Sequence, residues 1–263
     1  MLEEFIENGA DIDDIRGAAM KIAEARPMMA SVFRLANDLL FNLEDMQSVD
    51  GALRFIERFV EEMEVSAQRV TDQASQLVAE SGTVMTHSFS SLVKETVLKS
   101  LESNPSLRII CTESRPKNEG VKFAQALCEA GAETILVTDA AAGYMCKRAD
   151  MLLLGADGIG SFGLVHKTGS YPLSLVAKEN GIPTVVLAGR EKIWPFKLER
   201  VVEPPKPAGE IAEKGCFERV NLYFDTTPLK FIDRVVTEIG ILDRNRIEAL
   251  SKETPLHPLL ASE

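Results

Sequence analysis

The sequence predicts an α/β protein in which a helical N-terminal domain, residues 1–80, precedes a Rossmann-like parallel-sheet domain, residues 81–263. Apolar residues recur at helical spacing up to residue 80, whereas short apolar runs alternate with amphipathic stretches beyond it. The charge changes at the same point, because residues 1–80 hold 17 acidic and 7 basic residues and the remainder is close to neutral. Strands that alternate with helices at this spacing imply a parallel sheet covered on both faces.

Three helices are expected in the N-terminal segment. Leu53, Ile56, Val60 and Met63 form one apolar stripe along the last of them. At 1.5 Å per residue this helix has a length of about 43 Å. The predicted helices cover about 14–25, 28–44 and 52–80.

The second segment predicts six strands with helices between them. Residues 107–112 are apolar on both faces near their end, as central parallel strands must be. The predicted strands are 84–86, 107–112, 133–138, 151–155, 183–188 and 235–238. The predicted helices are about 89–102, 118–130, 140–148, 169–180 and 228–233, and residues 201–219 are expected to form a surface loop.

Composition and charge exclude several classes of protein. The chain contains no run of about 18 apolar residues, so no membrane partner is expected. A net charge of −11, concentrated in the N-terminal segment, repels polyanions and argues against a nucleic-acid partner. The four cysteines are scattered without a C-x-x-C pair, which indicates reduced thiols in a cytoplasmic protein.

Motifs for standard cofactors and metals are also missing. There is no Walker phosphate loop and no G-x-S-x-G nucleophile elbow. The glycines of 155–160 follow a strand, but they have G-x-x-G-x-G spacing and no helix follows them at once. They therefore do not match the dinucleotide-binding fingerprint. The three histidines lack metal-ligand spacing. No cofactor and no metal site are therefore predicted.

Polar residues follow several predicted strands at the sheet edge where open α/β sheets bind ligands. The segment 86–91 offers either plain helix caps or free helix amides for an anion. Arg115 precedes a proline, so it is expected in extended backbone. Its planar guanidinium group either binds a phosphate or belongs to a simple surface arginine. Asp139 is interpreted as a cap of the helix that follows it.

Asp157 emerges from an apolar strand between small residues. Burial would raise the pKa of this carboxyl and make it a general acid, whereas the alternative is an aspartate that orders the turn beside Gly158. Lys167 precedes the start of a predicted helix, whose first turn is interpreted as a phosphate seat, and Lys192 adds a second cation. Either lysine alone would usually be solvated, but together these groups predict a small phosphorylated ligand.

Seven motifs occur in order over residues 81–242. They are Thr86-His-Ser-x-Ser, Thr112-Glu-Ser-Arg-Pro116, Asp139-Ala-Ala-x-Gly-Tyr-Met145, Gly155-Ala-Asp-Gly158, Lys167-x-Gly169, Asp225-Thr-Thr-Pro228 and Thr237-Glu-x-Gly240. With them the sequence resembles one superfamily, which comprises the alpha, beta and delta subunits of translation initiation factor 2B, ribose-1,5-bisphosphate isomerase and methylthioribose-1-phosphate isomerase. It resembles the archaeal members and the alpha subunit most.

The resemblance implies a dimer formed largely through the Rossmann-like domain. In the isomerases a cysteine and an aspartate flank the sugar and convert a C1-phosphorylated aldose into an open ketose phosphate. Matched by motif, Asp157 is that aspartate, and Ser88 occupies the cysteine position. A serine hydroxyl has a far higher pKa than a thiol and exchanges protons poorly without an activating base. His87 is adjacent in sequence, but neighbouring side chains usually diverge.

Further residues match ligand-binding positions of the family. Lys167 and Lys192 match positions that bind phosphate, and His166 stands where the isomerases typically have asparagine. Arg16-Gly17-Ala18 and Arg26-Pro27 resemble ligand-binding elements, although they lie closer together than the isomerase pattern predicts.

The sequence leaves two main functions open. Ser88, together with the retained cations, favours a regulatory protein that binds a sugar phosphate or a nucleoside monophosphate, forms a homodimer or larger homo-oligomer and has a translation initiation factor as a partner. Asp157 favours the alternative, an aldose–ketose isomerase that acts on a C1-phosphorylated pentose such as ribose-1,5-bisphosphate or methylthioribose-1-phosphate. An interaction subunit with an empty pocket is the third reading.

Overall fold

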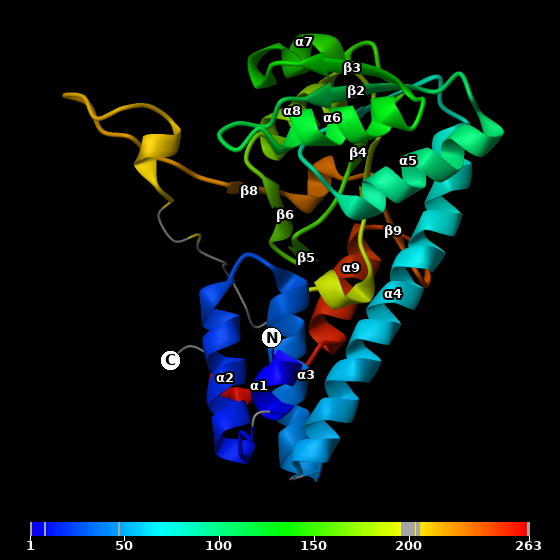
Figure 1. Ribbon diagram of the computed structural model, residues 1–263. Coiled ribbons are helices and arrows are strands. Elements are labelled where there is room, and N and C mark those ends of the chain that lie inside the picture. Colours follow the sequence, from blue (N-terminus) through cyan, green and yellow to red (C-terminus); the bar gives the residue numbers. More distant parts are fainter. Residues whose placement is uncertain (1, 8, 47, 196–202, 204–205, 262–263) are drawn as a thin grey trace.

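The computed structural model describes residues 2–7, 9–46, 48–195, 203 and 206–261. A helical part at the N-terminal end lies below a larger part built on a sheet (Figure 1). The expected α/β class, with N-terminal helices followed by a parallel sheet, is confirmed. The division into two domains between residues 80 and 81 stays a prediction.

The N-terminal helices are α1 (Leu2–Glu7), α2 (Ile12–Ala25), α3 (Ala30–Met46) and α4 (Val49–Ala79). Helix α2 begins where it does because Asp11 and Asp14 form a capping box, in which each carboxylate accepts a hydrogen bond from the other's amide. Ser48 caps α4 by accepting a hydrogen bond from the amide of Gly51. The three helices expected here are confirmed, whereas α1 was not predicted.

Helix α4 joins the two parts of the molecule. Its 31 residues span about 46 Å. Near its start, Ala52 and Ile56 are buried in the helical core, and toward its end Val70, Ala74 and Val78 are buried against the sheet. Figure 1 shows this helix running the length of the molecule.

The main sheet has seven strands in the order β10-β9-β7-β4-β1-β2-β3. All neighbours are parallel except β10, which runs antiparallel to β9 at one edge. The six predicted strands are all present. The strands are β1 (Thr83–Thr86), β2 (Arg108–Thr112), β3 (Glu133–Val137), β4 (Met151–Leu154), β7 (Thr184–Leu187), β9 (Arg234–Thr237) and β10 (Gly240–Leu242).

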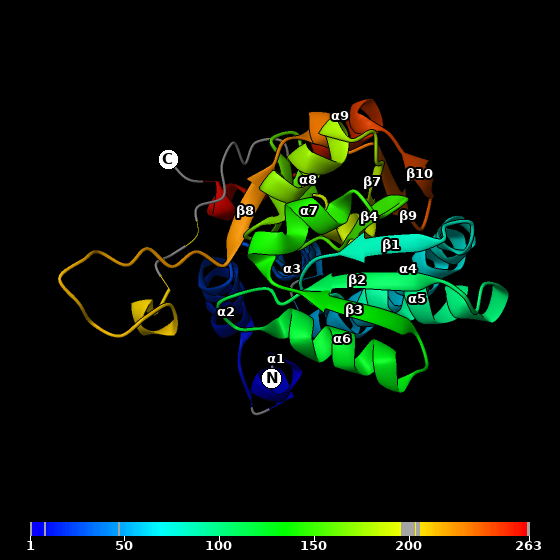
Figure 2. The same cartoon turned by 90° about the horizontal axis from the view of Figure 1, so that it is seen from above.

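Helices cover both faces of this sheet, as Figure 2 shows from above. Alternate strand residues point to opposite faces, so Val84 packs with α4, α5 and α6 and Met85 packs with α7, α8 and α9. These helices are α5 (Ser91–Ser103), α6 (Glu119–Glu129), α7 (Ala142–Cys146), α8 (Ser170–Glu179) and α9 (Arg244–Glu253).

A second, antiparallel sheet was not predicted. It consists of β5 (Gly158–Gly160), β6 (Gly163–Lys167) and β8 (Phe224–Thr227), in the order β5-β6-β8. Before β8 the chain forms an arm, residues 206–222, that projects from the body in both ribbon views (Figures 1 and 2). The expected surface loop over 201–219 falls partly on this arm, and its residues 201–202 and 204–205 lie outside the described residues.

One expected helix is wrong. Residues 228–233 form only a short 3-10 turn, Leu229–Phe231. Pro228 precedes this turn, and Ile232 then returns to extended backbone because the chain continues directly into β9. The six residues between β8 and β9 thus form a single 3-10 turn instead of an α-helix.

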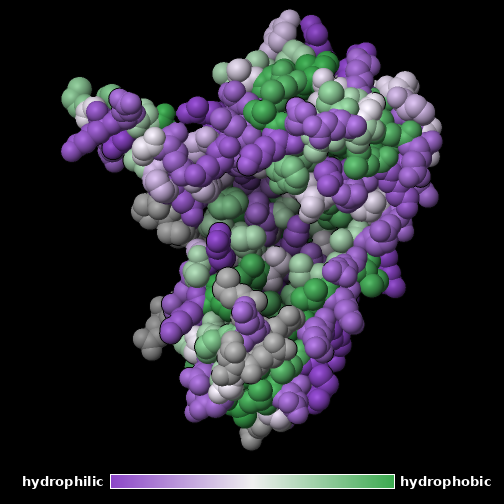
Figure 3. Space-filling model, in the orientation of Figure 1, coloured by the Kyte–Doolittle hydropathy of each residue, from purple (hydrophilic) through white to green (hydrophobic). Residues whose placement is uncertain are grey.

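The core of the helical part contains residues from far along the chain. Trp194 is buried there with a tilted ring contact to Phe33, and Leu256 and Leu260 pack against the same cluster. None of the described helices is long and apolar enough to cross a membrane. In Figure 3 the surface is hollowed between the lower helical part and the upper sheet part, with hydrophilic side chains visible inside the hollow.

Candidate functional site

The candidate residues gather where the strand order of the main sheet reverses. The chain places β2 and β3 on one side of β1, and β4, β7 and β9 on the other. Adjacent parallel strands that lead away in opposite directions leave a crevice at their carboxyl ends, where α/β proteins bind ligands. Ser88 follows β1 by two residues and Asp157 follows β4 by three, so both follow the carboxyl ends of the adjacent strands where the order reverses.

Ser88 is held in an unusual backbone conformation. Its φ is +71°, in the left-handed region that costs free energy for a residue other than glycine. Its amide donates a hydrogen bond of 2.8 Å to the hydroxyl of Ser114, which itself has a φ of +60°. The Ser88 hydroxyl in turn lies 3.5 Å from Oε1 of Glu119. Strained backbone of this kind is concentrated at functional sites.

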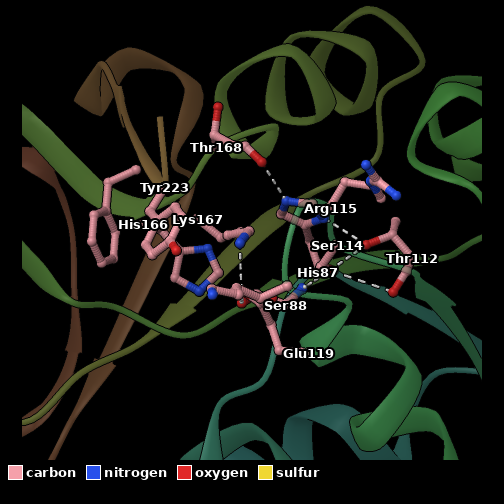
Figure 4. A network of polar contacts seen from close by, with 12 residues as sticks. His87, Ser88, Thr112, Ser114, Arg115, Glu119, His166, Lys167, Thr168 and Tyr223 are labelled. Carbon is pink, nitrogen blue, oxygen red and sulfur yellow. Dashed lines mark hydrogen bonds and ion pairs between the residues drawn. The ribbon is translucent and has the colours of Figure 1, made fainter. Parts of the chain in front are cut away.

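Lys167 and Glu119 form an ion pair beside Ser88. Lys167 ends β6, Glu119 opens α6, and Nζ lies 2.5 Å from Oε1. The Lys167 side chain is only 5% exposed, and its ammonium lies 5.3 Å from the ring centre of Tyr223. Figure 4 shows Ser88, Glu119 and Lys167 converging from three separate elements. Sequence reasoning missed Glu119, because an acidic residue in the first turn of a helix is ordinary.

His87 does not serve Ser88 as a base. Its Nε2 lies 2.8 Å from the carbonyl oxygen of Thr168, which can only accept, so Nε2 carries the proton. Its Nδ1 lies 2.5 Å from the hydroxyl of Thr112 and accepts a hydrogen bond from it. Burial lowers the pKa of His87, which favours this neutral form. Both ring nitrogens are thus committed to structural contacts, and the expected divergence from Ser88 is confirmed.

Asp157 lies in a buried and cationic environment. Burial raises the pKa of its carboxyl to about 6, although the nearby charges of Lys192 and Lys167 oppose that rise. Its backbone carbonyl accepts a hydrogen bond of 2.8 Å from the amide of Ala30, at the start of α3. The helical part therefore contacts the turn that carries this carboxyl.

His166 is buried in the same surroundings. Burial is the main reason that the pKa of His166 falls to about 3, and the neighbouring groups His87, Lys192 and Lys167 contribute to the same fall. Its Nδ1 lies 2.8 Å from the hydroxyl of Ser170. The imidazole is neutral near pH 7, so it offers a ligand a hydrogen bond but no charge.

The first turn of α8 is not free to bind a phosphate, so its interpretation as a phosphate-binding site is wrong. The carboxylate of Asp225 accepts hydrogen bonds from the amide of Gly169 at 2.7 Å and from that of Tyr171 at 3.1 Å. This carboxylate therefore takes the place that an external anion would occupy at the helix N-terminus. The motif at 225–228 was quoted only as part of the resemblance, and β8, which brings Asp225 to α8, was not predicted.

Arg115 is not brought into the cluster. Its side chain is exposed and donates to the carbonyl oxygen of Ile211 at 3.4 Å, toward the arm, and the Arg115–Pro116 peptide bond is cis. The interpretation of Asp139 as a helix cap is wrong, because its carboxylate accepts hydrogen bonds from the amides of Ser114 and Arg115 instead. Asp139 thereby fixes the loop after the neighbouring strand.

The three candidate residues of the helical part, Arg16, Gly17 and Arg26, lie at different positions along α2 and its carboxyl end. Arg26 is exposed and ends α2 in the turn that leads to Ala30, so this turn reaches the neighbourhood of Asp157. Arg16 pairs with Asp13, about 14 Å along the helix from its carboxyl end. Gly17 lies beside it, and a Cβ added there would meet nothing within 4 Å outside its own helix. The structure therefore brings the turn at Arg26 near the site, but not Arg16 or Gly17.

In the part of the chain that the structure describes, neither a cluster of metal ligands nor the groove beside α4 coincides with the site. Among the described residues no group of three histidine, cysteine, aspartate or glutamate side chains is arranged to hold a metal ion. A groove of about 800 Å³ runs between α4 and the segment 190–193, and none of the candidate residues lines it. Polar contacts, and not a large cavity, therefore distinguish the strand ends as the candidate site.

Comparison with known proteins gives the family. The model of the initiation factor 2 subunit family matches residues 2–244. A Pyrococcus abyssi protein named as translation initiation factor eIF-2B subunit 2-like is 32% identical over 244 residues, which are 92% of this chain and 85% of that protein. Ribose 1,5-bisphosphate isomerase of Archaeoglobus fulgidus is 30% identical over 253 residues, covering 92% and 81% of the two chains.

A solved structure agrees with these relatives. The translation initiation factor eIF-2B of Pyrococcus horikoshii matches this fold with a TM-score of 0.81 at 30% identity, over 92% of this chain and 87% of that one. The family model spans most of the chain and includes every candidate residue of the crevice. The chain therefore belongs to the initiation factor 2 subunit family.

Proposed function

We propose that the protein binds a small phosphorylated ligand, a sugar phosphate or a nucleoside monophosphate, and acts as a regulatory member of its family. One observation carries the proposal: the charges of Lys192 and Lys167 both act on the buried carboxyl of Asp157 at the reversal of strand order, where α/β proteins bind small molecules. The ammonium groups attract a phosphate, and the buried polar groups around them provide hydrogen bonds.

The surroundings of Ser88 favour binding over catalysis. Its hydroxyl has a carboxylate, Glu119, as its nearest partner at 3.5 Å, and His87 faces away. A carboxylate is far too weak a base to hold the proton of a serine hydroxyl at neutral pH. The group that would exchange protons with a sugar is thus poorly activated. Relatives named as eIF-2B subunit 2-like support a role outside catalysis.

Isothermal titration calorimetry tests this proposal directly. Ribose 5-phosphate, ribose-1,5-bisphosphate and AMP are titrated into the protein, with ribose and adenosine as unphosphorylated controls. We expect binding of at least one phosphorylated compound and a much weaker response to its control. The proposal fails if none of the phosphorylated compounds binds at millimolar concentration.

An aldose–ketose isomerase is the second candidate, and the surroundings of Asp157 favour it. A carboxyl with a pKa of about 6 is protonated in about a tenth of molecules at pH 7, far more often than an ordinary aspartate, so it can act as a general acid. A relative named ribose 1,5-bisphosphate isomerase supports the same chemistry. The substrate would be a C1-phosphorylated pentose such as ribose-1,5-bisphosphate or methylthioribose-1-phosphate, and the product the open ketose phosphate.

Product analysis separates the two candidates. The protein is incubated with each pentose phosphate, and ketose formation is followed by NMR. If turnover occurs, Asp157→Asn should abolish it and Ser88→Cys should raise it, because a thiol ionises far more readily than a hydroxyl. An unchanged rate in Asp157→Asn would remove the isomerase candidate, and the absence of ketose with every substrate would favour the regulatory function.

We also propose that the chain forms a homodimer or a larger homo-oligomer in the cytoplasm and works with a translation initiation factor. Its four cysteines are free, as expected in a reducing compartment. Strand β3 has a free edge among the described strands, and apolar side chains are exposed beside it, Leu136 at 46% and Tyr144 at 69%. A second copy would bury these side chains.

A further inference from the structure

The two lysines of the site are in different states. Lys167 is almost fully buried and already paired, with Nζ 2.5 Å from Oε1 of Glu119. Lys192 is half-buried, in the 3-10 turn that follows β7, and its ammonium makes no ion pair or hydrogen bond with any residue that the structure describes. The charge of Lys192 acts on the nearby groups Asp157, His166 and Glu191, although it forms no ion pair with either carboxylate. Lys167 is thus already paired, whereas Lys192 is available to bind a ligand.

Glu119 depends on Lys167. Both contacts of its carboxylate, with Lys167 and with Ser88, go to Oε1. Oε2 is buried and has no hydrogen-bond partner among the described residues. The ion pair is therefore the main compensation for a partly buried negative charge, and a phosphate that drew Lys167 away would leave the carboxylate without it.

We propose that Glu119 decides which cation receives the phosphate of the ligand: it holds Lys167 in an internal ion pair and leaves Lys192 as the phosphate anchor. This inference rests on the proposed function, because it concerns the same site and the same class of ligand. Glu119 is a specificity-determining residue in this scheme, and the Lys167–Glu119 pair offers the ligand a donor and an acceptor for hydroxyl groups instead of a net charge.

The proposal predicts opposite effects of two substitutions on the affinity for a phosphorylated ligand. Lys192→Ala removes the anchor, so it should weaken the binding of ribose 5-phosphate by about tenfold or more, the ordinary worth of one charge-assisted hydrogen bond. Glu119→Gln keeps the size and the acceptor but releases the charge of Lys167, so it should strengthen binding by about the same factor.

A double-mutant cycle tests the exchange of roles between the lysines. In the Glu119→Gln background, Lys167 is free to bind the phosphate, so Lys192→Ala should cost clearly less affinity than it costs in the natural background. Affinities for ribose 5-phosphate and for inorganic phosphate are measured by calorimetry for the natural protein, both single variants and the double variant. Ribose, which has no charge, should show no gain from Glu119→Gln.

A matched control separates local from general electrostatics. Glu133 at the start of β3 pairs with Arg108 at 2.7 Å, at the exposed amino ends of the strands and so at the far end of the sheet from the site. Glu133→Gln changes the net charge equally and should leave the affinity for phosphate unchanged. Should Glu119→Gln fail to fold, Glu119→Asp retains the charge but retracts the carboxylate from Lys167, and it should strengthen binding in the same direction by a smaller factor.

The outcomes are distinguishable. Unchanged or weaker binding in the folded Glu119 variant, or unchanged binding in Lys192→Ala, would overturn the inference while the natural protein still binds ribose 5-phosphate and the proposed function stands. If neither the natural protein nor any variant binds the phosphorylated probes, the proposed function fails and the inference fails with it.

Discussion

The backbone amide of Ser114 donates a hydrogen bond of 2.8 Å to Oδ1 of Asp139. The second oxygen of the same carboxylate accepts a hydrogen bond of 2.7 Å from the amide of Arg115, so one side chain after β3 fixes the loop after β2. The hydroxyl of Ser114 in turn accepts the hydrogen bond of the Ser88 amide. Asp139 thus supports the backbone of Ser88 through an intermediate residue, without touching it.

Asp139→Ala should lower both stability and ligand affinity. Two amides lose their charged acceptor, at a cost of about 1.5 kcal/mol or more in the free energy of unfolding, and Ser88 loses part of its support. Asp150→Ala is the matched control, because Asp150 also accepts from two consecutive amides, those of Gly82 and Thr83, but at the amino ends of the strands. Urea denaturation and calorimetry with ribose 5-phosphate measure both effects. Equal affinities in the two variants would contradict the proposed path from Asp139 to Ser88.

Gly169→Ala should destabilise the fold more than an ordinary substitution of a left-handed glycine. Its φ is +106°, and a Cβ there would meet Nε2 of His87 at 2.9 Å. Gly131 has a similar φ of +91° with nothing within 4 Å, so Gly131→Ala reports the backbone cost alone, about 1–2 kcal/mol. The overlap with His87 should add about 1 kcal/mol or more to the loss in Gly169→Ala. Equal urea midpoints for the two variants would show that His87 moves aside without cost.

Self-association should depend on the free edge of β3. The natural protein is expected to have a mass in solution of at least twice 28.9 kDa, and Leu136→Asp should lower it to that of one chain, since a charge cannot be buried unpaired in an interface. Val60 of α4 is equally exposed, so Val60→Asp serves as control and should leave the mass unchanged. Light scattering after size exclusion measures all three. An oligomer that survives Leu136→Asp intact would place the interface elsewhere.

Much of the fold was predictable, because long-range architecture here follows local patterns. Residues 107–112 and 151–155 are apolar on both faces, which only central strands of a covered sheet require. The strands of the small sheet gave no such signal. β5 has three residues, two of them glycines, and its pairing with β6 depends on contacts that no local pattern records.

The candidate site was predictable only in part, for a related reason. The rule that ligands bind beyond the strand ends points to Ser88, Asp157 and Lys167 without knowledge of their distances. What the sequence did not reveal is how the surrounding acids are used. Glu119 and Asp225 each occupy a position that looks free in the sequence, beside Lys167 and at the start of α8 respectively, because the folded chain supplies its own anions there.

Asp157 should lower stability as the pH rises from about 4 to about 6, because its pKa is about 6 when folded and its ordinary value is 3.8. Between these values the folded protein holds a proton that the unfolded chain has released. His87 and His166 act in the opposite direction, because burial lowers their pKa values and the unfolded chain binds protons there that the folded protein does not. The contribution of Asp157 is therefore measured as a difference between variants: the gain in free energy of unfolding from pH 4.5 to pH 7, measured by urea denaturation, should be larger in Asp157→Asn than in the natural protein. Asp72→Asn is the control: the hydrogen bond from Lys99 lowers the pKa of Asp72, so its loss should leave this gain unchanged or make it smaller. Asp225, whose pKa burial also raises to about 6, contributes equally in all three proteins. A gain in Asp157→Asn identical to that of the natural protein would mean that Asp157 is ionised as readily in the folded protein as in the unfolded chain, which would remove the physical basis for a proton donor at this position.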